Sequence, residues 1–262
     1  MEANKYVLFK FREINKNLLD TLVKSYLYFA FPDKLNDPFD CQIDVCASIT
    51  SAIARCQDSK IREQLVTFKQ SEDFWKAGHL VKTAGIFSSC VGKDKQADIL
   101  AGWDSHTMWS HYADGHKGVC LTYQFDEQWF HENKDHVVAT DRVQYGESPI
   151  SDWFVSNETG SFTRPDLSDQ LADDPGIRLL MKLFTSKSPA WEYEQEARII
   201  ARESGPYPIQ QSHLAQICFG LHTSQSDIDL IHKICDRSGY SVTFARMKRG
   251  EGDFGLTYEE MN

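Results

Sequence analysis

The 262-residue sequence contains no C-x-x-C pair. Its seven cysteines are scattered, at positions 41, 46, 56, 90, 120, 218 and 235. This spacing predicts neither a zinc ribbon nor a thioredoxin-type redox motif. Several cysteines, including Cys120 and Cys218, lie inside apolar runs, which indicates buried free thiols in a reduced protein.

Basic residues are also in short supply. Acidic residues outnumber Lys and Arg by 38 − 28 = 10. This balance argues against broad, charge-driven binding to nucleic acid, because such binding needs basic patches that displace counterions. It leaves room for a small anionic ligand held by one or two arginines.

Long apolar runs are missing as well. No uncharged apolar stretch approaches membrane-spanning length. The opening residues, MEANKYVLFK, lack the basic and then apolar pattern of a signal peptide. We therefore expect a cytoplasmic protein with no membrane partner.

The sequence does contain an irregular succession of short strands and helices. Strands are predicted at 5–13, 26–31, 85–91, 118–125, 191–200, 216–220 and 240–247. Helices are predicted at 15–25, 104–118, 177–187 and 226–239, with a helical insertion at about 51–82 and a polar surface excursion at 146–176. Asn15 and Ser226 are the expected N-caps, and Gly239 is the expected end of the last helix. Because strands and helices do not alternate regularly, we predict an α+β fold in a single domain, 1–262.

Alternating charges mark the stretch WEYEQEARII, residues 191–200. In a strand, Glu192, Glu194, Glu196 and Arg198 would share one face. Such a face is either a solvated edge or a rigid platform for paired carboxylates, which stabilise an oxocarbenium-like transition state. For the second case we expect Glu192 to be exposed and Glu196 to be the most buried of the three. Arg198 would then keep Glu196 ionised.

Arg12 ends the first predicted strand, in LFKFRE. An arginine at a strand end can bind a phosphate bidentately, a task for which it is better suited than lysine. The alternative is a surface arginine paired with Glu13 or Asp33.

The stretch NDPFD, residues 36–40, places Asn36, Asp37 and Asp40 around a proline. Asx residues beside proline commonly form hydrogen-bonded turns, so a structural loop is one interpretation. The same side chains could instead line a ligand cleft or contribute to a metal site.

The densest motif is MWSHYADGHKG, residues 108–118. Trp109 and Tyr112 are three residues apart, which places them on one helix face. His111 and His116 are five apart and miss the four-residue spacing of two zinc ligands on a helix. Trp109 and Tyr112 are expected in the core or in a cleft wall, with His111 and the Tyr112 hydroxyl as candidate polar contacts.

In this order, LFKFR, LYFAFPDKLNDPFD, MWSHYADGHKGVCL and WEYEQEARII resemble the uncharacterised bacterial domain-of-unknown-function family 2971, over about residues 6–220. More distantly, the motif order resembles the ADP-ribosyltransferase fold of the Arg–Ser–Glu type. That resemblance implies a split two-sheet β core and NAD as substrate.

Residue by residue, the resemblance implies that Arg12 binds the NAD phosphates and that Ser88 and Ser89 shape the nicotinamide cleft. Glu196 would bind the 2′-hydroxyl of the nicotinamide ribose, and Glu194 would orient or deprotonate the acceptor. The serine strand reads S-S-C instead of S-T-S, and the WSHYAD segment has no fixed place in the scheme. Asn36, Asp37, His111 and Tyr112 are expected to contribute to the same cleft.

The resulting functional hypothesis is an NAD-dependent ADP-ribosyltransferase-like enzyme. It would cleave the nicotinamide–ribose bond and pass ADP-ribose to a protein, a nucleic acid or water, as a toxin or phage-defence effector. One alternative is a metal-dependent nuclease or hydrolase that uses Asp37, Asp40, His111 and Glu194. The other is a non-catalytic interaction module, in which Arg12, Tyr112 and Glu196 would not meet in one pocket. The sequence does not indicate an oligomeric state.

Overall fold

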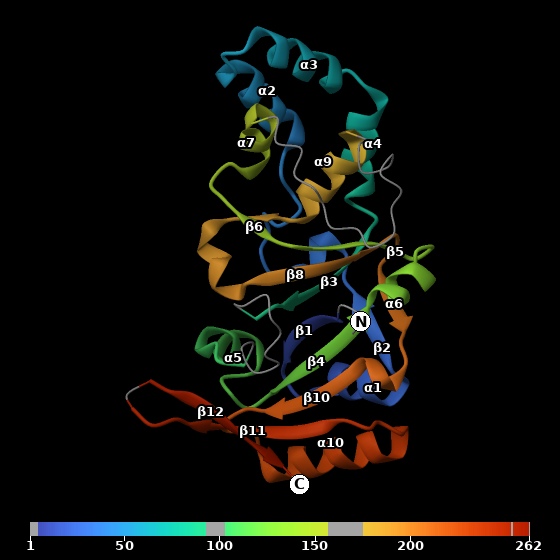
Figure 1. The fold of residues 1–262 in the computed structure, drawn as a ribbon, viewed down its shortest axis with the longest axis vertical. Helices are drawn as coiled ribbons and strands as arrows, with labels where there is room; N and C mark the ends of the chain where they lie inside the picture. The colour runs from blue at the N-terminus through green and yellow to red at the C-terminus, as the bar shows by residue number, and fades with distance from the viewer. Residues whose placement is uncertain (1–4, 93–102, 157–174, 253, 262) are drawn as a thin grey trace.

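A computed structural model describes residues 5–92, 103–156, 175–252 and 254–261 of a mixed α/β protein (Figure 1). Its strands are β1 Lys5–Arg12, β2 Tyr26–Phe29, β3 Gly85–Cys90, β4 Val119–Asp126, β5 Val137–Arg142, β6 Gln144–Tyr145, β7 Ser186–Lys187, β8 Glu196–Ala201, β9 Gly205–Pro208, β10 Leu214–Phe219, β11 Thr243–Arg249 and β12 Leu256–Met261. Its α-helices are α1 Lys16–Lys24, α2 Val45–Arg55, α3 Ser59–Lys69, α4 Glu72–Leu80, α5 His106–Tyr112, α6 Glu127–Glu132, α7 Pro149–Ser156, α9 Pro175–Phe184 and α10 Gln225–Ser238. Short 3₁₀ turns are η1 Pro32–Lys34, η2 Pro189–Glu194 and η3 Gln211–His213.

The largest sheet has eight strands in the order β12-β11-β10-β4-β1-β3-β8-β5. Neighbouring strands are antiparallel except β10 and β11, which α10 connects as a parallel pair. The join between β1 and β3 is narrow, because only Phe9 and Cys90 are in register there, whereas β1 pairs with β4 along its whole length. The expected pair of separate sheets is therefore one connected sheet whose two parts meet at a single residue pair.

Three hydrophobic clusters hold the layers together. The first packs α1, α6 and α10 against β1, β4, β8 and β10, and the second packs α2, α4, α7 and α9 against β3, β5 and β8. The third places α5 on β1, β4, β10 and β11. Figure 1 shows α2, α3, α4, α7 and α9 gathered beyond β8, with α1 and α10 at the opposite end. The first cluster crosses the narrow join between β1 and β3, because it includes both Leu8 on β1 and Phe87 on β3.

Local signals explain most helix ends. Asn15 caps α1 by accepting a hydrogen bond from the Leu18 amide at 3.0 Å, as predicted. Gly239 ends α10 in a left-handed conformation with φ 77°, also as predicted. The N-cap of α10 is Ser224, however, and the prediction of Ser226 was wrong by two residues.

The predicted strand over 191–200 was wrong in its first half. Residues Pro189–Glu194 form the 3₁₀ turn η2, and Gln195 ends it in a left-handed conformation with φ 45°. The strand β8 begins only at Glu196. Glu192 and Glu194 therefore do not alternate with Glu196 along one strand face.

The helix predicted over 104–118 is also shorter, since α5 ends at Tyr112. Asp114, Gly115 and His116 all have positive φ, between 47° and 70°, so the chain turns sharply there. Gly118 follows, and a Cβ at this position would lie 2.2 Å from the Arg12 carbonyl oxygen. The motif's glycine therefore permits the close approach of this turn to the end of β1.

The helical insertion begins earlier than predicted, because α2, α3 and α4 run from Val45 to Leu80. In the polar excursion, residues 149–156 form α7, with Ile150 and Phe154 buried. The rest of the excursion, 157–174, lies outside the described residues. Among the helices that are described, none has the length and apolarity to cross a membrane.

Candidate functional site

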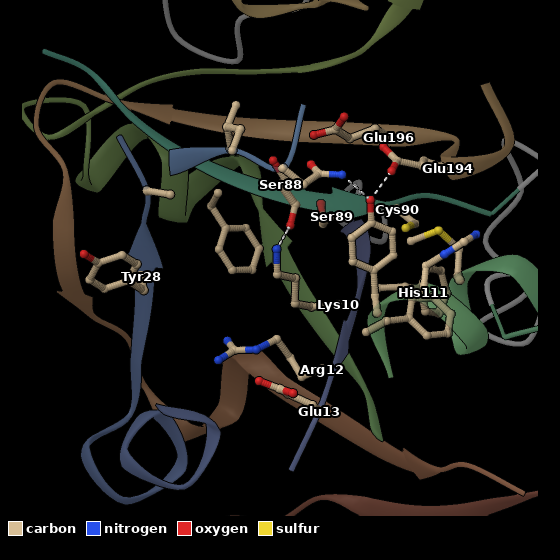
Figure 2. Close-up of a pocket in the computed structure, with 18 of the residues that line it drawn as sticks. Lys10, Arg12, Glu13, Tyr28, Ser88, Ser89, Cys90, His111, Glu194 and Glu196 are labelled. Carbon is tan, nitrogen blue, oxygen red and sulfur yellow. Dashed lines mark hydrogen bonds between the residues drawn. The ribbon is translucent and has the colours of Figure 1, made fainter. Parts of the chain in front are cut away.

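A pocket of about 890 Å³ opens beside the narrow join between β1 and β3 (Figure 2). It is lined by eight of the predicted site residues: Arg12, Asn36, Ser88, Ser89, His111, Tyr112, Glu194 and Glu196. Asp37 is not one of the lining residues. Its carboxylate is buried and accepts a hydrogen bond from the Phe39 amide at 2.9 Å, so Asp37 shapes the turn of its loop.

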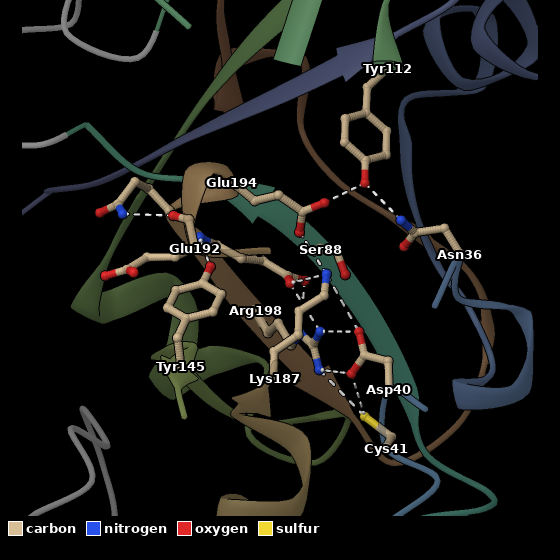
Figure 3. Close-up of polar contacts among 12 residues, drawn as sticks. Asn36, Asp40, Cys41, Ser88, Tyr112, Tyr145, Lys187, Glu192, Glu194 and Arg198 are labelled. Carbon is tan, nitrogen blue, oxygen red and sulfur yellow. Dashed lines mark hydrogen bonds and ion pairs between the residues drawn. The ribbon is translucent and has the colours of Figure 1, made fainter. Parts of the chain in front are cut away.

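Tyr112 links two of the sequence motifs inside this pocket (Figure 3). Its hydroxyl accepts a hydrogen bond from the side-chain Nδ2 of Asn36 at 2.7 Å and donates one to Glu194 Oε1. Burial raises the pKa of Tyr112 above its usual range, and the hydrogen bond to Glu194 raises it further. Tyr112 is therefore a neutral donor that fixes the Glu194 carboxylate at the pocket wall.

Glu196 lies deeper, at the start of β8, and both of its carboxylate oxygens are engaged. Arg198 donates to Oε1 at 2.8 Å and to Oε2 at 2.9 Å, and Lys187 donates to Oε2 at 3.1 Å. Burial opposes ionisation, but the charges and hydrogen bonds of Arg198 and Lys187 outweigh it and lower the pKa of Glu196 to about 2. The prediction that Arg198 keeps Glu196 ionised is consistent with this arrangement.

The three glutamates differ in exposure. Glu192 is exposed, as predicted, whereas Glu194 and Glu196 are each 4% exposed. The prediction that Glu196 is the most buried was therefore wrong, because Glu194 is buried to the same extent. The tight turn at Gln195 folds Glu194 back toward Lys187 instead of directing it to solvent.

Arg198 and Asp40 connect the pocket floor to the NDPFD loop. Arg198 is fully buried and donates to both Asp40 oxygens, at 2.9 and 2.6 Å, and to the Phe184 carbonyl at 2.7 Å. Burial disfavours the charged guanidinium, yet Glu196 and Asp40 raise the pKa of Arg198 above its usual range. Asp40 therefore serves as a partner of Arg198.

Sequence reasoning missed Lys187, the central cation of the cluster. Its ammonium lies 2.6 Å from Glu194 Oε2, 3.1 Å from Glu196 Oε2 and 3.6 Å from Asp40. Burial lowers the pKa of Lys187, but these carboxylates raise it more, so the net shift is upward. The prediction ran one helix through 177–187, and the only available signal was a lone lysine just before Pro189 and the acidic stretch.

Lys10 was also missed, although it stands two residues before Arg12 in β1. Its ammonium donates to the Ser88 backbone carbonyl across the narrow join. Burial lowers the pKa of Lys10 to about 8, assisted by the positive charge of Arg12. By strand alternation, Lys10 and Arg12 lie on the same face of β1.

The remaining polar groups of the pocket have structural partners or are neutral. Ser89 donates to the Ala197 carbonyl at 2.9 Å within the sheet, whereas Ser88 is half-buried beside the pocket. All seven cysteines are free, and burial raises the thiol pKa of Cys90 and of Cys41. His111 is exposed at the rim, where its ring lies 5.9 Å from that of Tyr193.

The cluster carries a net negative charge, because Asp40, Glu194 and Glu196 face Lys187 and Arg198. Among the residues that the structure describes, no group of three or more His, Cys, Asp or Glu side chains could hold a metal ion. Of the acids that the metal hypothesis requires, Asp40 and Glu194 are engaged by cations, and Asp37 accepts a hydrogen bond from the Phe39 backbone amide. The pocket is thus lined by the carboxylates of Glu194 and Glu196 and by two further cations, Lys10 and Arg12.

Comparison with known proteins gives a match to a family model. No curated protein and no solved structure matches the chain. Residues 108–199 match the model of a family described as "Protein of unknown function (DUF2971)". The matched segment is shorter than the 6–220 expected for the resemblance, and it contains Tyr112, Lys187, Glu194, Glu196 and Arg198. The family model thus covers the carboxylate side of the pocket and supports the resemblance over that segment.

Proposed function

We propose that this protein binds NAD and cleaves its nicotinamide–ribose bond. The observation that carries the proposal is the convergence of Arg12, Tyr112 and the pair Glu194 and Glu196 on one pocket. Its volume, about 890 Å³, falls within the range of small-molecule sites and accommodates a dinucleotide. The implied ADP-ribosyltransferase-like fold belongs to the same proposal.

In this proposal the nicotinamide ribose lies against the carboxylates. Glu194 is held at the wall by Tyr112 and Lys187, so it is positioned to accept a hydrogen bond from a ribose hydroxyl or a proton from the nucleophile. Both oxygens of Glu196 accept from charged donors, Arg198 and Lys187. By contrast, among the described residues Glu194 Oε1 accepts only from the neutral Tyr112 hydroxyl. We therefore assign to Glu196 the electrostatic stabilisation of the oxocarbenium ion from the pocket floor. Glu194, and not Glu196, would make the main hydrogen bond to the ribose.

The proposed reaction breaks the bond between C1′ of the ribose and the pyridinium nitrogen. The bonding electrons leave with neutral nicotinamide, and positive charge develops on the ribose. Water or an acceptor nucleophile then forms the new bond to C1′ and loses a proton, which Glu194 takes up. The products are nicotinamide, a proton and either free or transferred ADP-ribose.

The two alternatives predict different structures. The interaction-module hypothesis required Arg12, Tyr112 and Glu196 to be apart, yet all three line one pocket. The metal-dependent hypothesis needs free acids, whereas Asp40 is paired with Arg198 and Glu194 with Lys187. NAD cleavage is compatible with both observations.

The test is release of free nicotinamide from NAD by the purified protein. Glu194→Gln removes the proposed base and should lower the rate by about 10²-fold or more. Glu192→Gln is the matched control, because Glu192 is exposed and two residues away, and it should retain the wild-type rate. Equal rates for the two variants would contradict the role of Glu194, and no release by the wild-type protein would contradict the proposed reaction.

A further inference from the structure

Lys10 and Arg12 are two neighbouring cations on one face of β1, and both line the pocket. In the part of the chain that the structure describes, neither makes an ion pair, and the side chain of Arg12 makes no hydrogen bond. The expected alternative partners are occupied elsewhere: Glu13 accepts from Asn15, and Asp33 lies 3.4 Å from Lys34. Figure 2 shows the two side chains beside each other, with the Lys10 ammonium directed at Ser88.

This arrangement contrasts with the other half of the pocket. There, Lys187 and Arg198 are matched by three carboxylates. Two like charges in a partly buried position repel each other and lose solvation, and neither of these two is compensated by an ion pair within the described residues. An anion bound between them would remove both costs, and the arginine fork suits a phosphate group in particular.

We propose that Lys10 joins Arg12, to which the resemblance already assigns phosphate binding, as the second cation of an oxyanion subsite for the phosphate groups of a nucleotide-type ligand. The identity of that ligand as NAD rests on the proposed function. The subsite itself rests on the unpaired cations and on their place in the pocket. Its chemistry is that of a diphosphate, because two cations two residues apart can each bind a different phosphate group.

The surroundings of Lys10 make anion binding dependent on pH. The groups that act on it are Arg12 on β1, Cys90 on β3, Glu194 on η2 and Glu196 on β8. The Cys90 thiol stays neutral, because burial raises its pKa. The pKa of Lys10 is about 8 in the free protein, and a bound phosphate would raise it. Above pH 8, Lys10 is mostly neutral in the free protein and must take up a proton when the phosphate ligand binds. The affinity for the ligand therefore falls as the pH rises above 8.

A purely structural role for Lys10 makes a different prediction. Its hydrogen bond to the Ser88 carbonyl joins β1 to β3 where only Phe9 and Cys90 pair. If Lys10 served only as this link, its removal would lower the unfolding temperature without changing the affinity of the folded protein for phosphates. The affinity would also not depend on the protonation of Lys10.

The experiment measures binding of ADP and of inorganic pyrophosphate by calorimetry. Lys10→Met should weaken both by about tenfold or more, whereas Lys10→Arg keeps the charge and should stay within about threefold of wild type. Lys5→Met is the matched control, because Lys5 is exposed on the same strand and does not line the pocket. Thermal unfolding of each variant establishes that it is folded at the temperature of the measurement.

The pH profile supplies the second readout. With a free pKa of about 8, wild-type affinity for ADP should fall about tenfold between pH 7 and pH 9, and Lys10→Met should lose this slope. Unchanged ADP affinity in folded Lys10→Met, or no binding of either probe to wild type, would overturn the subsite. ADP binding with this profile but no nicotinamide release would leave the subsite standing and remove NAD cleavage. Nicotinamide release by wild type together with unchanged ADP affinity in Lys10→Met would support NAD cleavage and overturn the subsite.

Discussion

Arg198 binds both oxygens of Asp40, at 2.9 and 2.6 Å, although 158 positions separate the two residues. Both side chains are buried, Arg198 in β8 and Asp40 in the loop that leads to α2. The pair therefore fastens the helical insertion to the floor of the pocket. Because a buried charge without its partner is costly, this contact gives a direct test of the packing.

Asp40→Asn should destabilise the protein by about 1–3 kcal/mol, since it weakens two buried charge-assisted hydrogen bonds while Glu196 still compensates the charge of Arg198. Asp37→Asn is the control in the same loop, because an asparagine oxygen can still accept from the Phe39 amide. Urea unfolding followed by fluorescence gives the free energies of both variants. Similar small losses for the two would show that the Asp40–Arg198 pair contributes little.

Acid should destabilise the protein through Glu196. The pKa of Glu196 is about 2 in the folded protein, below the ordinary glutamate value of 4.5, so its stabilising contribution is fully present above pH 4.5. That contribution is lost as the pH falls from 4.5 toward 2, and it amounts to about 3 kcal/mol. Urea unfolding at a series of pH values should show this slope in wild type and a reduced slope in Glu196→Gln. Identical slopes would place the acid sensitivity elsewhere.

Tyr112→Phe removes the hydroxyl that links Asn36 to Glu194 and leaves the ring in place. We expect a loss of about 1–2 kcal/mol in stability, as for other buried hydrogen bonds. We also expect a loss of about tenfold or more in nicotinamide release, because Glu194 is no longer held in position. Tyr207→Phe is the matched control, because the Tyr207 hydroxyl also donates to a side chain, Asn133, but Tyr207 does not line the pocket. A Phe variant with the wild-type turnover rate would remove Tyr112 from the positioning of Glu194.

Arg12→Ala should weaken NAD binding by about tenfold or more, and Arg12→Lys should restore only part of the affinity, because lysine cannot bind a phosphate bidentately. Calorimetry with NAD measures both variants against wild type. Full restoration by lysine would show that the charge alone matters. Equal affinity of wild type and Arg12→Ala would exclude Arg12 from the ligand contacts.

Expression of the active protein in a bacterium should slow growth if NAD cleavage serves a toxin or phage-defence role. The expected effect is a fall in cellular NAD, because the substrate is consumed and not regenerated. Glu194→Gln should abolish both effects, and Glu192→Gln should retain both. Equal toxicity of the two variants, with unchanged NAD, would separate any growth effect from the proposed reaction.

Local features of this fold could be predicted from the sequence. Asn15 and Gly239 mark helix ends through contacts within a few residues, so their signals survive without knowledge of the tertiary structure. The apolar runs that form β4 and β10 can likewise be recognised from neighbouring residues alone. The left-handed Gln195 has no such signal, since a non-glycine residue rarely adopts that conformation. This residue converts an alternating strand into a turn.

The candidate site could be predicted only in part. Arg12, Tyr112 and Glu196 could be selected because their residue types suit chemistry at the ends of predicted elements. Lys187 could not, because its role depends on carboxylates from three separate elements that meet only in the folded chain. The sequence also does not reveal that Asp40 pairs with Arg198, because Arg198 is 158 positions away. Asp40 is therefore predicted as a possible ligand residue instead of a structural one.

The most direct test is a crystal structure of Glu194→Gln soaked briefly with NAD, because this variant should bind NAD but cleave it about 10²-fold more slowly than wild type. We expect the diphosphate to lie between Lys10 and Arg12, with C1′ of the nicotinamide ribose facing position 194 and the Tyr112 hydroxyl. NAD bound with its nicotinamide away from position 194, or bound outside this pocket, would contradict the central claim.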